Sequence, residues 1–390
     1  MLKAQLEKSH LVEKLSLVKY VLDKKDELTK YIWIESNNRN KVDLKILGMD
    51  ITFSTEVFCS SIEGVQEKDE IIGVNAKKFL ELISKLLPGE LILENKDEGF
   101  FVKQKRKKYK LPKASPSYGL VTPNFQGNFF SLFPEQVKSL LSYTAPSLDQ
   151  ESQFSECLYL GASGEQVEAC ATATNSMTHY RFHSPEFLEL FESLGDKKYF
   201  CIHKKYIKSL RQILSYYAKE CSSLTMALAV TPKQAIFRFN MQDFFAVPLD
   251  SNKFPSVKEV LDSLNNNKEN QVGLNKKDLE SALYRLEVLS LDRWEEIGPV
   301  KFEFTPDGAE LFYSSTDGSQ AIEFVESNGV VQDTLYLNLQ DIDRYLATFS
   351  ESDQIFLNQV EGTKPVSLIG DENVEFDSEA LAVLMPVVPE

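Results

Sequence analysis

A helical pattern that recurs in pairs constrains the fold of this chain more than any other feature of its sequence. Apolar residues spaced three and four apart predict six helices, which are Glu7–Leu22, Asn75–Leu87, Pro134–Tyr143, His203–Tyr217, Asn275–Leu289 and Asn338–Phe349. Within each pair the helices begin 68, 69 and 63 residues apart (7 to 75, 134 to 203 and 275 to 338). The first helix of a pair recurs after 127 and then 141 residues. Such periodicity indicates three copies of one unit.

Short strands are predicted between these helices, because many of the intervening segments alternate apolar and polar residues. The segments are Ile46–Phe58, Gly99–Lys110, Gln166–Thr172, Ala235–Asn240, Lys301–Phe304, Glu310–Ser314, Ala321–Val325 and Thr334–Leu337. We therefore expect an α+β fold of three repeated domains, each with two helices packed on antiparallel sheets. Linkers near 112–128 and 262–273, rich in Pro and Asn, place the domains at 1–122, 123–265 and 266–390.

Composition excludes several classes of protein. No run approaches the roughly 18 apolar residues that a membrane span needs, and the charged, helical N-terminus does not look like a signal peptide. The five cysteines form no CxxC pair, which favours reduced thiols and a cytoplasmic protein. The net charge of −15 divides into +4 over residues 1–120, −1 over 121–260 and −18 over 261–390. The acidic last third would repel DNA while the rest of the chain stays able to attract it, although an acidic domain with no electrostatic role is an equally good interpretation.

Basic residues recur on the predicted helices, on the faces opposite their apolar stripes. A single run of this kind is most often a solvated helix face, but its recurrence on the same element of successive repeats favours a surface that binds a polyanion. The candidates that we carry forward are Lys77, Lys78, Lys204, Lys205, Lys208 and Arg211.

The sequence offers little support for an enzyme. His179 and His183 are four residues apart, but no nearby carboxylate or cysteine completes a metal site. The chain contains no phosphate-binding loop, dinucleotide-binding, serine-hydrolase or zinc-protease motif. Acidic pairs such as Glu295-Glu296 are more often solvated surface than catalytic groups. We expect no catalytic residue, no metal and no cofactor; a hydrolase that uses surface carboxylates is the enzyme alternative.

Four segments resemble one known family, the bacterial DNA sliding clamp, which is the beta subunit of DNA polymerase III. Leu47-Gly48-Met49-Asp50 is similar to the family's L-G-T-D-L segment, and the run N-A-K-K-F-L-E-L-I from Asn75 is similar to its second helix. Residues 248–261, P-L-D-S-N-K-F-P-S-V-K-E-V-L, resemble its F-P-containing run, and Val383-Leu384-Met385-Pro386-Val387 its C-terminal segment. The resemblance covers essentially the whole chain.

The chain departs from the family pattern at three places. Residues 174–182 read T-N-S-M-T-H-Y-R-F where the family has T-D-G-H-R-L, Glu259 replaces a residue that is often basic, and Val388-Pro389-Glu390 extend past the usual terminus. These changes surround the partner-peptide pocket that the resemblance implies.

The resemblance implies a non-catalytic processivity factor. Two chains would join head to tail in a closed ring that encircles double-stranded DNA without reading its sequence and tethers the replicative polymerase and the clamp loader through short peptide motifs. By analogy Lys24, Lys25, Lys204 and Lys205 are the best-placed phosphate contacts. The alternative function is a repeat-built scaffold that binds only proteins.

The resemblance also implies two protein-binding sites. The dimer interface would join Leu82, Tyr109 and Leu111 to Val288 and Leu289. The basic segment 103–110 could strengthen that interface against the acidic third domain, bind nucleic acid, or deter edge aggregation. The candidate lining of the peptide pocket is Phe154, Thr174, Arg181, Phe182, Pro255, Val260, Pro365, Val383, Leu384, Met385, Pro386 and Val387. The alternative is that residues 383–387 are only a buried last strand.

Overall fold

A computed structural model describes most of the chain. Placement is described for all residues except 1, 23–28, 38–39, 49–50, 64–70, 115–126, 151–155, 221–222, 252–253, 255–256, 258, 260, 262–270, 290–298, 315–317, 330–333, 350–351, 359–363, 371–378 and 388–390. Both predicted linkers fall largely within these ranges.

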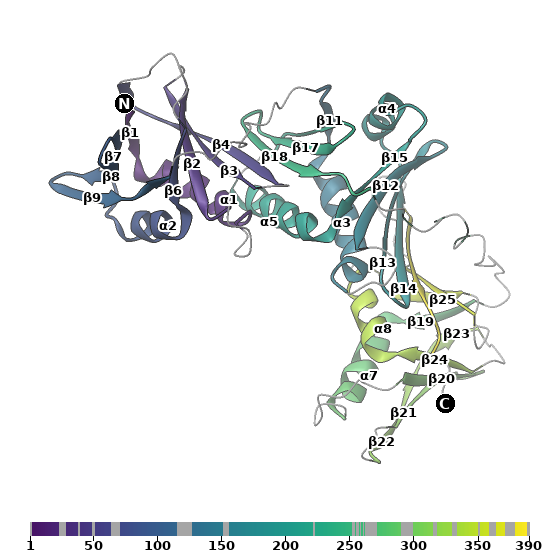
Figure 1. The fold of residues 1–390 in the computed structure, drawn as a ribbon. Helices are drawn as coiled ribbons and strands as arrows, with labels where there is room; N and C mark the ends of the chain where they lie inside the picture. The colour runs from purple at the N-terminus through teal and green to yellow at the C-terminus, as the bar shows by residue number, and fades with distance from the viewer. Residues whose placement is uncertain are drawn as a thin grey trace. The chain divides into compact units, whose positions relative to one another are not determined.

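The order of elements repeats three times along the chain (Figure 1). Each repeat has a strand, a helix, three strands, a connecting segment, then again a strand, a helix and three strands. The first repeat consists of β1 (Lys3–Glu7), α1 (Lys8–Lys19), β2 (Tyr31–Asn37), β3 (Lys41–Leu47), β4 (Thr52–Phe58), β5 (Ser61–Glu63), β6 (Ile72–Asn75), α2 (Ala76–Lys85), β7 (Glu90–Lys96), β8 (Gly99–Gln104) and β9 (Lys107–Leu111), followed by the short β10 (Lys113–Ala114).

The second and third repeats follow the same order. The second consists of β11 (Phe130–Leu132), α3 (Pro134–Leu148), β12 (Cys157–Ser163), β13 (Gln166–Thr172), β14 (Ser176–Phe182), α4 (Pro185–Ser193), β15 (Tyr199–His203), α5 (Lys204–Glu220), β16 (Met226–Val230), β17 (Gln234–Phe239) and β18 (Asp243–Pro248). The third consists of β19 (Val272–Asn275), α7 (Lys276–Val288), β20 (Pro299–Thr305), β21 (Gly308–Ser314), β22 (Gln320–Val325), β23 (Ser327–Asn328), β24 (Leu335–Asn338), α8 (Leu339–Leu346), β25 (Gln354–Asn358), β26 (Val366–Gly370) and β27 (Glu379–Leu384).

Two compact units contain these elements. One holds residues 1–135 and 205–249, and the other holds 136–204 and 250–390. The first unit contains the five-stranded sheet β5-β1-β7-β8-β9 and the nine-stranded sheet β10-β6-β2-β3-β4-β18-β17-β16-β11. The second contains the nine-stranded sheet β15-β12-β13-β14-β27-β26-β25-β19-β23 and the four-stranded sheet β22-β21-β20-β24. Antiparallel pairing of β4 with β18, and of β14 with β27, joins strands of successive repeats into one sheet.

The same cap begins one helix of the first repeat and both helices of the third. Asn75, Asn275 and Asn338 precede α2, α7 and α8, and each side chain accepts a hydrogen bond from the backbone N–H three residues later. Such a bond satisfies one of the amide groups left unpaired at a helix N-terminus. The predicted cap at Asn75 is therefore confirmed.

All six predicted helices are present, and the sequence analysis was wrong at three other elements. The segments predicted as single strands at 46–58 and 99–110 each contain parts of two paired strands. β3 ends at Leu47 and β4 begins at Thr52, and β8 ends at Gln104 and β9 begins at Lys107. The helix α4 was not predicted. Ser184 caps it and Pro185 begins it, while Phe187, Leu190 and Phe191 bury its apolar face; this signal was present in the sequence but was too short to give a periodic pattern.

Candidate nucleic-acid interface and assembly edges

A polar cavity of about 420 Å³ lies between the end of α1 and the first turns of α5. Lys19 from α1 and Lys205 and Lys208 from α5 all line it. Ser209 holds the two helices together, since its Oγ donates a hydrogen bond to the carbonyl oxygen of Tyr20 at 3.0 Å. Three ammonium groups around one polar cavity could bind an anion such as a phosphate.

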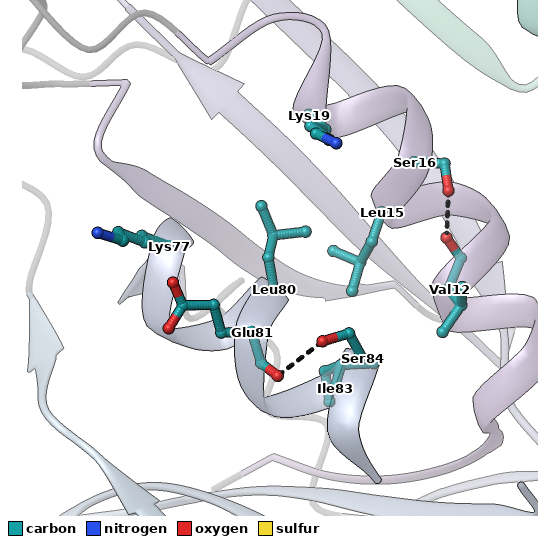
Figure 2. Close-up of a pocket in the computed structure, with 9 residues that line it drawn as sticks. All are labelled: Val12, Leu15, Ser16, Lys19, Lys77, Leu80, Glu81, Ile83 and Ser84. Atoms are coloured by element: carbon teal, nitrogen blue, oxygen red, sulfur yellow. Dashed lines mark hydrogen bonds between the residues drawn. The ribbon is translucent and has the colours of Figure 1, made fainter. Parts of the chain in front are cut away.

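A second groove, of about 370 Å³, lies between α1 and α2 (Figure 2). Its floor is apolar and includes Leu15, Leu80 and Ile83, while Lys19 and Lys77 stand at its rim. Lys19 therefore lines both hollows. The basic residues of α2, α1 and α5 form one continuous band within this compact unit, and Lys19 is the residue that links its two parts.

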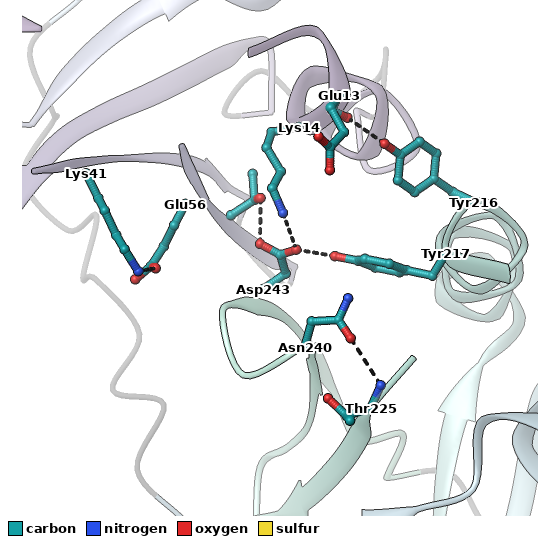
Figure 3. A network of polar contacts seen from close by, with 10 residues as sticks. Glu13, Lys14, Lys41, Glu56, Tyr216, Tyr217, Thr225, Asn240 and Asp243 are labelled. Carbon is teal, nitrogen blue, oxygen red and sulfur yellow. Dashed lines mark hydrogen bonds and ion pairs between the residues drawn. The ribbon is translucent and has the colours of Figure 1, made fainter. Parts of the chain in front are cut away.

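Below the basic band, a buried carboxylate joins four elements (Figure 3). Asp243, at the start of β18, is fully buried. Its oxygens accept hydrogen bonds from Lys14 of α1 at 2.9 Å, from Thr55 of β4 at 2.6 Å and from the hydroxyl of Tyr217 of α5. A buried charge is tolerated when it is paired and hydrogen-bonded, so this network fixes α1 and α5 against the β4–β18 junction.

Lys204 is held by neighbouring groups. Its Nζ lies 2.7 Å from a carboxylate oxygen of Glu156 and donates to the carbonyl oxygen of Gln150 at 2.9 Å. The hydrogen bond from Lys204 is the main influence that lowers the pKa of Glu156. A phosphate near Lys204 would therefore have to compete with this carboxylate.

The other predicted basic residues differ in accessibility. Lys77, Lys78, Lys205 and Lys208 are exposed, and the Nζ of Lys205 lies 4.6 Å from the centre of the Tyr206 ring. Arg211 is half-buried. Lys24 and Lys25 lie outside the described residues.

Each compact unit has one edge strand that bears on assembly. β9 is the last strand of the five-stranded sheet, and β22 is the first of the four-stranded sheet. Large apolar side chains are exposed beside β22, where Ile322 is 67% and Phe324 50% exposed, and on the adjoining α7, where Tyr284 is 68% and Val288 52% exposed. Exposed apolar residues at a strand edge mark a surface that other chains can cover.

Comparisons with known proteins find one group that is similar to this chain in sequence and in fold. No family model matches the chain. A beta sliding clamp of Helicobacter pylori (strain ATCC 700392 / 26695) is 23% identical over 270 residues, which are 67% of each protein. The DNA polymerase sliding clamps of Caulobacter crescentus and Bacillus subtilis each have 16% identity and a TM-score of 0.82, with 100% of both chains covered.

The chain has the fold of the bacterial beta sliding clamps. The fold expected from the resemblance is therefore confirmed over the full length of the chain.

Of the five residues expected at the dimer interface, two lie on the end strand β9 and three lie on or next to helices. Tyr109 and Leu111 are on β9, and Leu82 is half-buried on α2. Val288 ends α7 and Leu289 is its C-cap. Arg285 of α7 binds Glu323 of β22 through two hydrogen bonds of 2.8 and 2.7 Å, which lowers the pKa of Glu323 and fixes the helix against the edge strand.

The residues expected to line a peptide pocket are only partly brought together. Pairing of β14 with β27 places Met177 opposite Val383 and Ser176 opposite Leu384. Leu261 and Leu381 pack against the pair formed by Met177 and Val383. Thr174 and Met385 are exposed nearby, and the backbone N–H of Met385 donates to the carbonyl oxygen of Asn175 at 2.9 Å.

Arg181 and Phe182 lie at the other end of β14. Arg181 is opposite Glu379, five residues along β27 from Leu384, a separation of about 17 Å. Phe182 is fully buried against Tyr180 and Phe187. Arg181 and Phe182 are therefore well separated from Val383 and Leu384, and the strand register places Met177 beside the C-terminal end of β27 instead.

The remaining pocket candidates vary in placement. Pro365, Pro386 and Val387 are half-buried, and the N–H of Val387 donates to the carbonyl oxygen of Tyr336 at 2.9 Å. Val383 and Leu384 are buried at the end of β27, and residues 385–387 follow that strand. Phe154, Pro255 and Val260 lie outside the described residues.

The two histidines considered for metal binding do not converge. His179 is buried in β14 with its Nε2 3.8 Å from Glu168, and the Nδ1 of His183 lies 3.1 Å from the carbonyl oxygen of Glu165. The described residues contain no group of three side chains suited to a metal ion. Among the described helices, none has the length and apolar content to cross a membrane.

Proposed function

We propose that this protein is a DNA sliding clamp, a ring of two chains that encircles duplex DNA and tethers the replicative polymerase. The observation that carries the proposal is the way in which successive repeats join. Together with the full-length likeness to clamps, it supports a closed ring over a scaffold that binds only proteins.

The joints follow one rule. The third strand after the first helix of a repeat pairs with the third strand after the second helix of the next repeat: β4 with β18, and β14 with β27. In the third repeat the corresponding strand is β22, and its counterpart in the first repeat is β9. Both end a sheet order. A second copy of the chain therefore supplies the missing strand at each end, and head-to-tail pairing closes two such joints. We accordingly keep the division into domains at 1–122, 123–265 and 266–390 as a proposal.

The basic band on the helices is proposed to face the duplex. Lysines on flexible stems meet phosphates and read no base edges, so the contact is independent of sequence. Because encirclement keeps the protein on DNA, affinity for linear DNA needs to be only weak.

The end of β14 and β27 is proposed to bind the short motifs of the polymerase and the clamp loader. Met177, Leu261 and Val383 give it an apolar floor, and Thr174 and Met385 are accessible beside it. Flexible methionines on such a surface accept apolar peptide side chains. A cytoplasmic location is also proposed, supported by the free thiols of Cys59, Cys157, Cys170 and Cys201.

The proposed function is tested on nicked circular DNA. Protein loaded on the circle is expected to co-elute with it in gel filtration at a salt concentration that abolishes binding to linear duplex, and to dissociate when a restriction enzyme cuts the circle. A protein-only scaffold would not co-elute with the circle. Persistence on the cut molecule would contradict encirclement.

Neutralising the basic band is expected to weaken binding of linear duplex. In the variant Lys19→Gln/Lys205→Gln/Lys208→Gln, the slope of log affinity against log salt should fall by about 0.9 for each lost phosphate contact, or up to about 2.7. Fluorescence anisotropy with a labelled duplex measures both quantities. A triple variant of three other exposed lysines, Lys197→Gln/Lys198→Gln/Lys233→Gln, removes the same charge and is the matched control. An unchanged slope in the lysine variant would remove these residues from the DNA path.

Introducing a charge at the α7 edge is expected to separate the two chains. Val288→Asp should raise the dimer dissociation constant by at least about tenfold, because a carboxylate would be buried without a partner at the joint. Sedimentation equilibrium measures the constant. Met241→Asp is the matched control, since Met241 is also an exposed apolar residue (67%) but lies in the turn between β17 and β18. Equal dissociation constants for the two variants would place the interface elsewhere.

A further inference from the structure

The hairpin formed by β8 and β9 carries an unusual density of positive charge. Residues 103–113 include seven lysines and arginines and no acidic residue. Lys105, Arg106, Lys107, Lys108 and Lys110 are all exposed. The proposed ring accounts for the edge of β9 but not for this charge.

The strand register divides the residues of the hairpin between two faces. Phe100 contacts Phe79 of α2, and Tyr109 and Leu111 follow the same face because they lie opposite Val102 and Phe100. Lys108 and Lys110 lie opposite Lys103 and Phe101, on the face away from the helices. A new strand beside β9 would use its edge N–H and C=O groups and leave both faces in place. The outward lysines therefore remain accessible in a ring.

The proposed dimer joint does not neutralise these lysines. β22, the strand that β9 would meet, has one acidic residue, Glu323, and that carboxylate is already held by Arg285. Within the hairpin's own sheet, Glu94 pairs with Lys103 at 2.7 Å and lies 3.5 Å from Lys96. In the described part of the chain no ion pair involves Lys108 or Lys110.

Two features of the hairpin lower its stability. Lys103 lies directly opposite Lys108, and like charges at such positions repel. Lys105 occupies the two-residue turn with φ 53°, a backbone conformation that favours glycine or asparagine. A polyanion bound across the hairpin would reduce the repulsion between Lys103 and Lys108 and could also bind Lys105 in the turn.

We propose that the outward face of the β8–β9 hairpin is a second nucleic-acid site, outside the ring, that binds single-stranded DNA through its phosphates. The spacing fits an extended strand, since Lys108 and Lys110 are about 7 Å apart along β9. Phe101 is only 3% exposed, and the Nζ of Lys108 lies 4.1 Å from its ring centre. No aromatic ring is offered to stack on bases, so the binding is electrostatic and insensitive to base identity. The same absence of exposed apolar side chains disfavours an amphipathic peptide or insertion into a membrane.

The test compares two triple variants of the full-length protein that remove the same charge. One is Lys105→Gln/Lys108→Gln/Lys110→Gln, and the other is the helix variant Lys19→Gln/Lys205→Gln/Lys208→Gln. The probe is a labelled oligo-dT of thirty nucleotides, with poly-glutamate and phosphatidylserine vesicles as competitors. The hairpin variant is expected to bind the oligonucleotide about tenfold more weakly at low salt, with a salt slope smaller by about 2. It should keep the wild-type dimer mass and remain on nicked circular duplex.

Three results would overturn the proposal. If both variants lose the same affinity for oligo-dT, only net charge matters. If the hairpin variant loses its dimer mass, the lysines belong to the joint. If poly-glutamate or vesicles compete better than unlabelled oligo-dT of equal charge, the site prefers another polyanion. Because retention on the nicked circle is measured separately, failure of this proposal is distinguishable from failure of the ring.

Discussion

Replacing Asp243 with alanine is expected to lower the free energy of unfolding by about 3–5 kcal/mol, the range for breaking a buried ion pair. The variant leaves the ammonium of Lys14 and the hydroxyls of Thr55 and Tyr217 without the carboxylate that they share. Because Asp243 begins β18 beside β4, the loss should loosen the junction of the first two repeats. Urea unfolding followed by the fluorescence of Trp33, which is buried in β2, measures the change in a Trp294→Phe background.

The control for this prediction is Asp97→Ala, which removes an exposed carboxylate from the turn between β7 and β8. It should change the free energy of unfolding by less than about 0.5 kcal/mol. If Asp243→Ala were no more destabilising than this control, the buried network would have no structural role.

The second large effect is a gain in stability above pH 6 from Asp43→Asn. Asp43 lies on β3 between Glu35 of β2 and Glu56 of β4. Burial raises its pKa from 3.8 to about 6; Glu56 and Glu35 add to the rise, and Lys45 and Lys41 oppose it. Since a folded-state pKa above the unfolded value favours the folded protein only while the group is protonated, stability is lost as the pH rises from about 4 to 6. A shift of about two units corresponds to up to about 3 kcal/mol.

Asparagine keeps the shape and does not ionise, so the variant should escape this loss. The stability difference between Asp43→Asn and the wild type, measured by urea unfolding with Trp33 fluorescence, should be largest at pH 8 and should vanish near pH 4. Asp97→Asn supplies the matched control. A constant difference across this range would show that the effect does not come from ionisation of Asp43.

The repeating architecture could be predicted because its signals are local. Apolar spacing marks each long helix. The cap of α2 is also local, because the Asn75 side chain bonds the backbone N–H of Lys78, only three residues later. The hairpin of β8 and β9 was missed because its turn relies on a positive φ at Lys105, which gives none of the usual glycine or asparagine signals. The short α4 was missed for lack of periodicity.

The candidate site was harder to predict because its residues meet through long-range packing. Lys14 and Lys19 lie on one helix and have the same side-chain chemistry, yet only Lys19 lines the polar cavity while Lys14 is bound to Asp243. That difference depends on β18, more than two hundred residues away. The register of β14 on β27 is likewise set by the folded sheet, so motif order alone could not show that Arg181 and Phe182 lie far along β14 from Val383 and Leu384.

Encirclement of DNA is tested most directly by sealing the ring covalently. A variant with Lys108→Cys on β9 and Ile322→Cys on β22 places one thiol on each side of both proposed joints, and a bismaleimide can close them after loading on nicked circular DNA. The single-cysteine variants control for reaction of the native thiols. The account predicts a protein–DNA complex that survives denaturing detergent and is released only when the circle is cut. Covalently closed dimers that leave the intact circle in detergent would contradict it.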